Sequence, residues 1–164
     1  MFMFLFLLAV ALVSALGMNC PKSSALMHAG CEVTIRFKNT CADVQDEIRS
    51  RINGQGSIWT DPHNNGTYSI IDANKALFQL SRLTGDEKYT DLINFSFEAE
   101  SDSDCVVTAC SESQVYSIGD AGTNFCNSYD LYCNEEACHP LTKLDYEYNT
   151  GKCTECNPQK CLVV

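Results

Sequence analysis

The sequence predicts an α+β domain in which one helix packs on a small antiparallel sheet, with a disulfide-rich C-terminal extension. Three observations support this class. A strictly alternating segment at 32–38 is followed at once by a capped amphipathic helical pattern at 40–54. Further alternating segments lie between residues 67 and 99, with turn residues between them. The chain also carries 11 cysteines, a density typical of disulfide-stapled extracellular proteins.

The first segment, residues 1–17, is expected to be a cleavable signal peptide. It is apolar and free of charged residues, ends in small residues, and is shorter than the roughly 20 residues that span a bilayer. Cleavage after Gly17 would make 18–164 the mature chain, a single secreted domain without a membrane span. A membrane anchor is the alternative that this length disfavours.

Residues 31–110 form the predicted α+β core. Val33, Ile35 and Phe37 alternate with polar residues and predict the first strand. Thr40 can cap the helix, because Asp43 follows three residues later, and Gly54 is a typical helix end. The helix buries a face of Cys41, Val44, Ile48 and Ile52. Further strands are expected at 67–72, 76–83, 92–99 and 105–110.

No regular period persists beyond residue 110, so we interpret 111–164 as a loop-rich, Cys-rich extension. An odd number of cysteines leaves one free or joined to another chain. The four at 133, 138, 153 and 156 also fit the spacing of a zinc site, and the last two fit a redox pair, but an oxidising compartment favours disulfides. The disulfide candidates are Cys20, Cys31, Cys41, Cys105, Cys110, Cys126, Cys133, Cys138, Cys153, Cys156 and Cys161.

The chain is acidic, with a net charge of −10. This charge disfavours nucleic-acid binding, because it would repel phosphates. It lies entirely between residues 89 and 142, which hold ten acids and no base. The densest part, 98–104, is expected to be a solvated loop between two strands. Its alternatives are a Ca²⁺ site and a docking face for a cationic partner; otherwise we expect no cofactor.

Two sequons predict a glycoprotein, at Asn65 and Asn94. Asn94 alternates with the apolar residues of its strand, so a glycan there would point away from the core. The segment Asp61-Pro62-His63 before the first sequon is interpreted as a polar turn. The single tryptophan, Trp59, and the tyrosines are expected in the core, with a sugar- or peptide-binding platform as the alternative.

These features favour a binding or interaction module with an extracellular protein or glycan as ligand, a cationic ligand included. Whether the chain is an enzyme stays open, with a non-enzyme favoured, because it has three histidines and none of the common catalytic motifs. The alternatives are a small extracellular hydrolase and a secreted protease inhibitor. The helix-on-sheet order resembles cystatins, although the Gln-x-Val-x-Gly hairpin of that family is missing.

Several strings resemble a group of small secreted Cys-rich proteins of unicellular eukaryotes. They are DPHNNGTY at 61–68, LSRLTGD at 80–86 and ACSESQV at 109–115, followed by TNFC at 123–126 and LYC at 131–133. The resemblance covers about residues 31–138. It implies a single extracellular domain and carries over no catalytic or binding residue.

Overall fold

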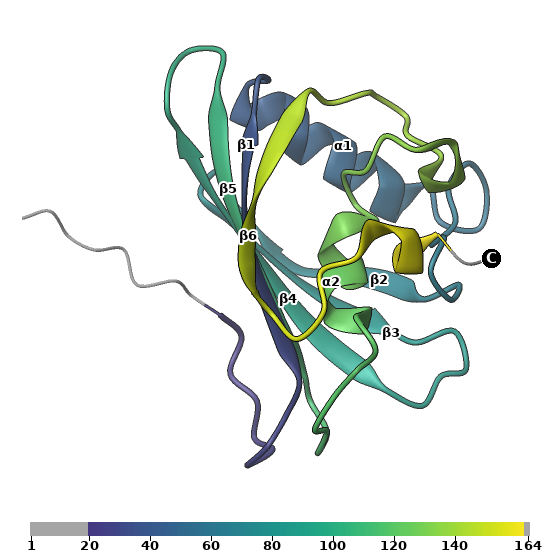
Figure 1. Ribbon diagram of the computed structural model, residues 1–164. Coiled ribbons are helices and arrows are strands. Elements are labelled where there is room, and N and C mark those ends of the chain that lie inside the picture. Colours follow the sequence, from purple (N-terminus) through teal and green to yellow (C-terminus); the bar gives the residue numbers. More distant parts are fainter. Residues whose placement is uncertain (1–19, 163–164) are drawn as a thin grey trace, which may run out of the picture.

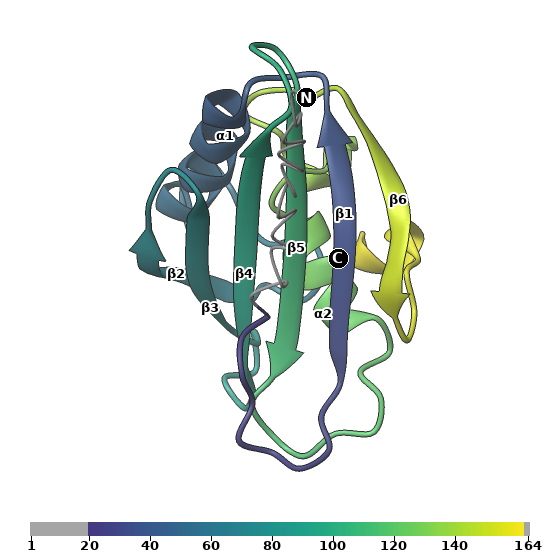
Figure 2. The ribbon, with the colours of Figure 1, turned by 90° about the vertical axis from the view of Figure 1, so that its left-hand side faces the viewer.

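In the computed structural model, which describes residues 20–162, six strands form one antiparallel sheet in the order β2-β3-β4-β5-β1-β6 (Figures 1 and 2). Two helices, α1 and α2, lie on the same face of this sheet (Figure 1). The predicted α+β class is therefore confirmed, whereas the expected signal peptide, 1–17, lies outside the described residues. The elements are β1 (Gly30–Phe37), α1 (Cys41–Asn53), β2 (Thr67–Ala73), β3 (Leu77–Leu83), β4 (Thr90–Ala99), β5 (Cys105–Ser113), α2 (Thr123–Tyr129), β6 (Tyr146–Cys153) and the 3-10 turns Glu136–Cys138 and Pro158–Cys161.

Helix α1 begins at the predicted capping box. The Thr40 hydroxyl accepts a hydrogen bond from the Asp43 N–H at 3.1 Å, and the Asp43 carboxylate accepts one from the Thr40 N–H at 3.1 Å. The predicted apolar face is buried, with Val44 and Ile48 fully covered. Helix and first strand thus form where local sequence signals placed them.

The core lies between the sheet and the two helices. Trp59 is part of it, because its side chain is buried and its Nε1–H donates to the Cys138 carbonyl at 2.9 Å. The interpretation of Trp59 as a core residue is therefore confirmed. The sheet contributes Val33, Ile35, Phe37, Phe78, Leu80, Ile93, Phe95, Phe97, Val107 and Ala109, and the covering elements contribute Val44, Ile48, Ile52, Phe125, Tyr129, Leu131 and Tyr132.

The opposite face of the sheet carries the start of the N-terminal segment, which is tied to β5 by the Cys20–Cys110 disulfide, and the rest of that segment loops beyond the strand ends before β1 (Figure 2). Asn94 pairs with Cys110 across β4 and β5, so it faces this side, away from the core. Its side chain is nevertheless only 6% exposed, whereas Asn65 lies exposed in a turn. A glycan on Asn94 would therefore have to be attached before this face is covered.

The C-terminal part differs from the expected loop-rich extension. It supplies helix α2, which is buried against the sheet, and strand β6, which pairs with β1 as an edge strand. The seven residues of α2 are buried almost all round, so they show no amphipathic period. Strand β6 is dominated by polar residues, so it shows no apolar alternation.

Five disulfides close the fold, and the odd cysteine, Cys156, is free. All three N-terminal cysteines are bonded to distant parts of the chain. Of the four cysteines with zinc-like spacing, those at 133, 138 and 153 are in disulfides, the pairing that the sequence favoured. The bonds are Cys20–Cys110, Cys31–Cys153, Cys41–Cys105, Cys126–Cys161 and Cys133–Cys138. Within residues 20–162, no helix has the length and apolar character needed to cross a membrane.

Candidate functional site

A row of polar side chains crosses the helix-facing side of the sheet near one end. Tyr68 of β2 is the cross-strand partner of Arg82 in β3, Arg82 is the partner of Asp91 in β4, and Asp91 is the partner of Ser113 in β5. All four occupy positions that the strand alternation turns inward, and all four are buried. The apolar core therefore ends here, and a polar network takes its place.

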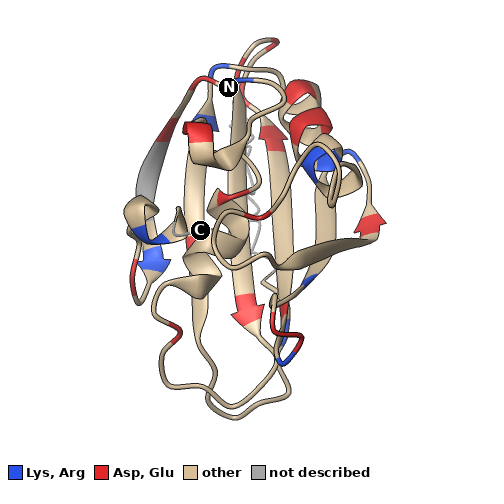
Figure 3. Ribbon diagram, turned by 90° about the vertical axis from the view of Figure 1, so that its right-hand side faces the viewer, with Lys and Arg blue, Asp and Glu red and all other residues tan. Residues whose placement is uncertain are grey.

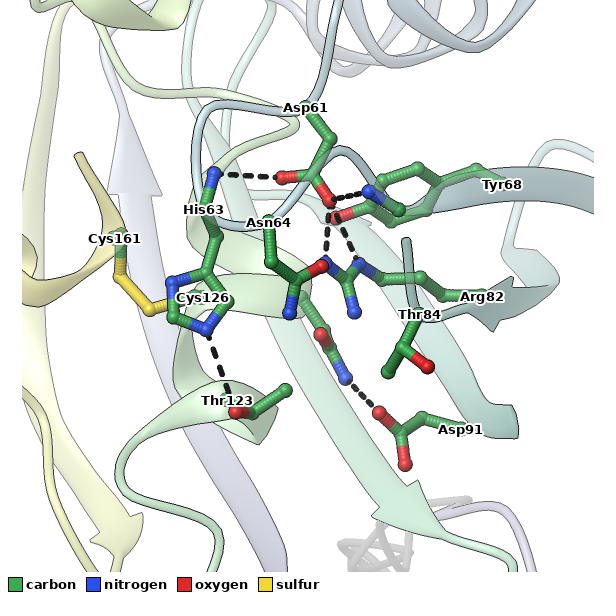
Figure 4. A network of polar contacts seen from close by, with 12 residues as sticks. Asp61, His63, Asn64, Tyr68, Arg82, Thr84, Asp91, Thr123, Cys126 and Cys161 are labelled. Atoms are coloured by element: carbon green, nitrogen blue, oxygen red, sulfur yellow. Dashed lines mark hydrogen bonds and ion pairs between the residues drawn. A yellow bond between two sulfur atoms is a disulfide. The ribbon is translucent and has the colours of Figure 1, made fainter. Parts of the chain in front are cut away.

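Arg82 is the centre of this network (Figure 4). Its guanidinium forms a fully buried ion pair with Asp61, and its Nε donates to Asp61 Oδ2 at 3.1 Å. The same guanidinium donates to Asn64 Oδ1 at 2.5 Å and lies over the Tyr68 ring. Gly66 is required beside it, because a Cβ there would lie 2.5 Å from the Arg82 guanidinium carbon. The loop from 61 to 66 is thus fastened to the sheet through one arginine.

Side chains of helix α2 form hydrogen bonds with Asp91 and Ser113, the β4 and β5 members of the polar row. Asn127 Nδ2 donates to Asp91 Oδ2 at 2.8 Å, and Asn124 Nδ2 donates to Ser113 Oγ at 3.0 Å. Asp120 accepts the backbone N–H of Asn124 at 2.6 Å, which fixes the start of the helix. Buried amide and carboxylate groups therefore fix the position of α2 on the sheet.

A second buried ion pair lies behind the first. Glu47 and Arg51, one turn apart in α1, pair at 2.7 Å with both side chains buried. Arg51 also donates to the backbone carbonyls of Asp130 and Cys133, and Glu47 accepts the backbone N–H of Leu141. Burial and the neighbouring Asp61 carboxylate raise the pKa of Asp130 well above its ordinary value.

An open cleft of about 670 Å³ lies on the solvent side of the polar row, and Asp91 and Ser113 of the row line it. It is bounded by the turn between β3 and β4 and by the segment between β5 and α2. Two exposed tyrosines, Tyr89 and Tyr116, stand at it, being 51% and 66% exposed. The described lining has three carboxylates and no lysine, arginine or histidine. The lining residues are Asn64, Thr84, Gly85, Asp86, Tyr89, Asp91, Ser113, Val115, Tyr116, Ser117, Gly119, Asp120 and Thr123.

His63 is the histidine beside this cleft (Figure 4). Burial, together with the Arg82 charge, lowers its pKa, so the ring is neutral at pH 7. Its Nδ1–H donates to the Lys160 carbonyl at 3.0 Å, and Nε2 lies 3.4 Å from the Thr123 hydroxyl. That hydroxyl donates its proton to the Asp120 carbonyl at 2.7 Å. Because the hydroxyl proton is directed at the Asp120 carbonyl, the long contact with Nε2 is a poor arrangement for a base that activates a nucleophile.

The structure brings together only part of what the sequence singled out. Asp61 is buried in an ion pair, so the expected polar turn at 61–63 is anchored to the sheet. Residues 100–104 of the acidic segment form the expected loop between β4 and β5, whereas Glu98 and Ala99 still belong to β4. There Glu100 pairs with Arg36 at 3.0 Å, and Asp104 lies 3.6 Å from Lys38.

The polar row was not predicted from the sequence. The signal that marks it is the parity of the strands. Arg82 follows the inward residues Phe78 and Leu80 by the same step of two, and Asp91 precedes Ile93 in the same way. Comparisons with protein-family models, with curated proteins and with solved structures find no match to this chain.

Proposed function

We propose that this protein is a secreted binding module, and that the cleft between the β3–β4 turn and the β5–α2 segment binds a neutral or cationic ligand rich in hydroxyl groups, of the class of short glycans. The observation that carries the proposal is the chemistry of the lining: three carboxylates, several hydroxyls and an amide, two exposed tyrosines, and no cationic side chain.

Each part of this lining suits such a ligand. Carboxylate and amide oxygens accept hydrogen bonds from sugar hydroxyls, and they attract amino groups. Tyrosine presents an apolar ring that can contact the face of a sugar ring, and a hydroxyl that reaches water. An anionic ligand would meet Asp91 and Asp120 without a cation in the lining, although Asp86 beside them is paired with Lys88 at 2.9 Å.

The polar network beneath the cleft holds side chains of the lining in place before a ligand binds. Asp91, which lines the cleft, is held by Asn127, and Asn64 is held by Arg82. Side chains fixed in this way lose little conformational freedom when a ligand binds. Secretion is supported by the apolar leader, by the sequons and by the five disulfides, which are typical of oxidising compartments.

Calorimetric titration with three sets of oligosaccharides tests the proposal: neutral, amine-bearing and sulfated. We expect binding in the first two sets and none in the third. Tyr116→Ala should weaken the affinity at least about tenfold, because an aromatic contact and its buried area are lost.

Ile71→Ala provides the matched control, since Ile71 is a 60% exposed residue of β2 outside the cleft. It should bind like the wild type. Binding of sulfated sugars alone, or equal losses in Tyr116→Ala and Ile71→Ala, would overturn the assignment of the cleft.

A further inference from the structure

Two loops at one end of the molecule form an exposed apolar tip, which we define as Leu26, Met27, Tyr116 and Ile118. Leu26 is 97% exposed, Ile118 74%, Tyr116 66% and Met27 48%. The loops come from the segment before β1 and from the segment after β5, and they project beyond the ends of the strands (Figures 1 and 2). Large exposed apolar side chains gathered in one place mark an interaction site.

The two loops are joined as one unit. The Ser117 N–H donates to the Met27 carbonyl at 3.1 Å, and the Ala29 N–H donates to the Ser117 hydroxyl at 2.8 Å. The Ser113 N–H donates to the Ala29 carbonyl at 3.0 Å. The tip is therefore held in place by hydrogen bonds between segments some 90 residues apart in the chain.

The tip also lacks formal charge. Residues 23–29 and 113–119 contain no Lys, Arg, Asp or Glu, although the chain carries a net charge of −10. The projecting loops at this end are uniformly tan in Figure 3. His28, the one histidine in these segments, lies 3.5 Å from Glu112 of β5.

We propose that this tip inserts into the interface of a lipid bilayer that has no net charge, such as one of phosphatidylcholine. The two loops project beyond the ends of the strands (Figures 1 and 2), so their exposed apolar side chains can enter a deformable apolar phase without a pre-shaped groove. Its lack of charge avoids the cost of desolvating ions, and a zwitterionic surface does not repel the acidic remainder of the chain. A tyrosine among the aliphatic residues suits the level of the headgroups.

Co-sedimentation of the mature chain with phosphatidylcholine vesicles tests this proposal. We expect the wild type to bind, and the double variant Leu26→Ser/Ile118→Ser to bind at least about tenfold more weakly, because two large apolar side chains no longer leave water. The matched control is Ile58→Ser/Ile71→Ser, which replaces two isoleucines that are 65% and 60% exposed away from the tip. The control should bind like the wild type.

Three results would overturn the proposal: no binding of the wild type, binding only when anionic lipid is present, or equal losses in both double variants. Neither Leu26 nor Ile118 lines the cleft, so glycan binding should be the same in the tip variant and the wild type. Tyr116 belongs to both sites, so Leu26 and Ile118 separate the two proposals: weaker vesicle binding with unchanged glycan binding in their double variant distinguishes the tip from the cleft.

Discussion

Two arginines and three carboxyl groups lie buried beneath the cleft, next to Asp91, whose buried carboxylate lines it and accepts from Asn127. Arg51 pairs with Glu47, and Arg82 pairs with Asp61, so these four charges cancel. Asp130 is the third carboxyl group, and among the described residues neither of its oxygens has a hydrogen-bond partner. An ionised Asp130 would leave the cluster with one uncompensated buried charge, which is costly. Burial and the lack of a partner therefore both favour the neutral form of Asp130.

Replacing Asp130 by asparagine tests this protonation state. Because the pKa of Asp130 is raised by folding, its stabilising contribution is complete below the unfolded pKa of roughly 3.9 and is lost as the pH rises through the folded value. Asp130→Asn removes this loss. Relative to the wild type, its free energy of unfolding should therefore increase from about pH 4 to about pH 8, as measured by urea unfolding. A variant that becomes relatively less stable with rising pH would show that ionised Asp130 is favourable.

Asp61→Asn should have the opposite effect. It leaves Arg82 buried without its counter-charge, and breaking a buried pair in this way costs about 3–5 kcal/mol. Equilibrium unfolding at neutral pH would measure the loss. Asp86→Asn is the control, because the Asp86–Lys88 pair is exposed and its removal should change stability little. Equal losses in both variants would refute the structural weight given to Arg82.

Cys156 should be the one cysteine that reacts in the native protein. It is free and half-buried, and burial raises the pKa of its thiol. The reactive thiolate is therefore scarce at pH 7, so alkylation by iodoacetamide should be slow there and should accelerate as the pH rises. Peptide mapping should find one label per chain, at Cys156, and none in Cys156→Ser. A label on Cys31 or Cys153, whose sulfurs lie within 4.8 Å of Cys156, would contradict the described pairing.

At the scale of elements, helix α1 shows which features are predictable from sequence. Its start depends on two residues three apart, and its buried face depends on a short period. Thr40→Ala should therefore destabilise the protein by about 1 kcal/mol, because the capping hydroxyl is lost. Denaturant unfolding measures this change. Thr60→Ala, at an exposed position, is the control, and an equal loss there would refute the role of the cap.

Helix α2 and strand β6 show what sequence reasoning could not find. The side chains of α2 contact the sheet with polar groups, such as Asn124 and Asn127, and these bond to serines 11 to 16 residues away. A polar residue in a buried contact resembles a surface residue when only its own neighbours in the chain are considered. The polar row of the candidate site could not be predicted for the same reason. Arg82 and Asp61 lie 21 residues apart in the chain and come into contact only in the folded structure.

The strands predicted at 67–72, 76–83 and 92–99 are confirmed as β2, β3 and β4, because apolar and polar residues alternate within each segment. Their pairing was not predictable in the same way. Strand β1 pairs with β5 and not with β2. Cys31 and β6 therefore lie near the edge of the sheet that is opposite to β2. Local pattern therefore determines which segments become strands, and long-range contacts determine their order.

At the scale of the whole molecule, the acidic charge is less uniform than the sequence indicates. Among the acids between residues 89 and 142, Asp91 and Asp130 are buried, and Glu100 and Asp104 face Arg36 and Lys38. Of the other acids in this range only Asp120 lines the cleft, which also holds Asp86 and Asp91, while the apolar tip carries no acid. The two proposed interaction sites therefore differ in charge, which is why their partners should differ.

The disulfides also act at this scale, because three of them join the first 22 described residues to distant parts of the sheet. Cys20–Cys110 spans 90 residues, whereas Cys133–Cys138 spans 5. In the chain-entropy model the long loop contributes about 4.5 kcal/mol and the short one about 2 kcal/mol. Cys20→Ser/Cys110→Ser should therefore lower the free energy of unfolding by about 2.5 kcal/mol more than Cys133→Ser/Cys138→Ser, as measured by urea unfolding. An equal or reversed order would mean that the local packing around Cys133 and Cys138, both fully buried, outweighs the constraint on the unfolded chain.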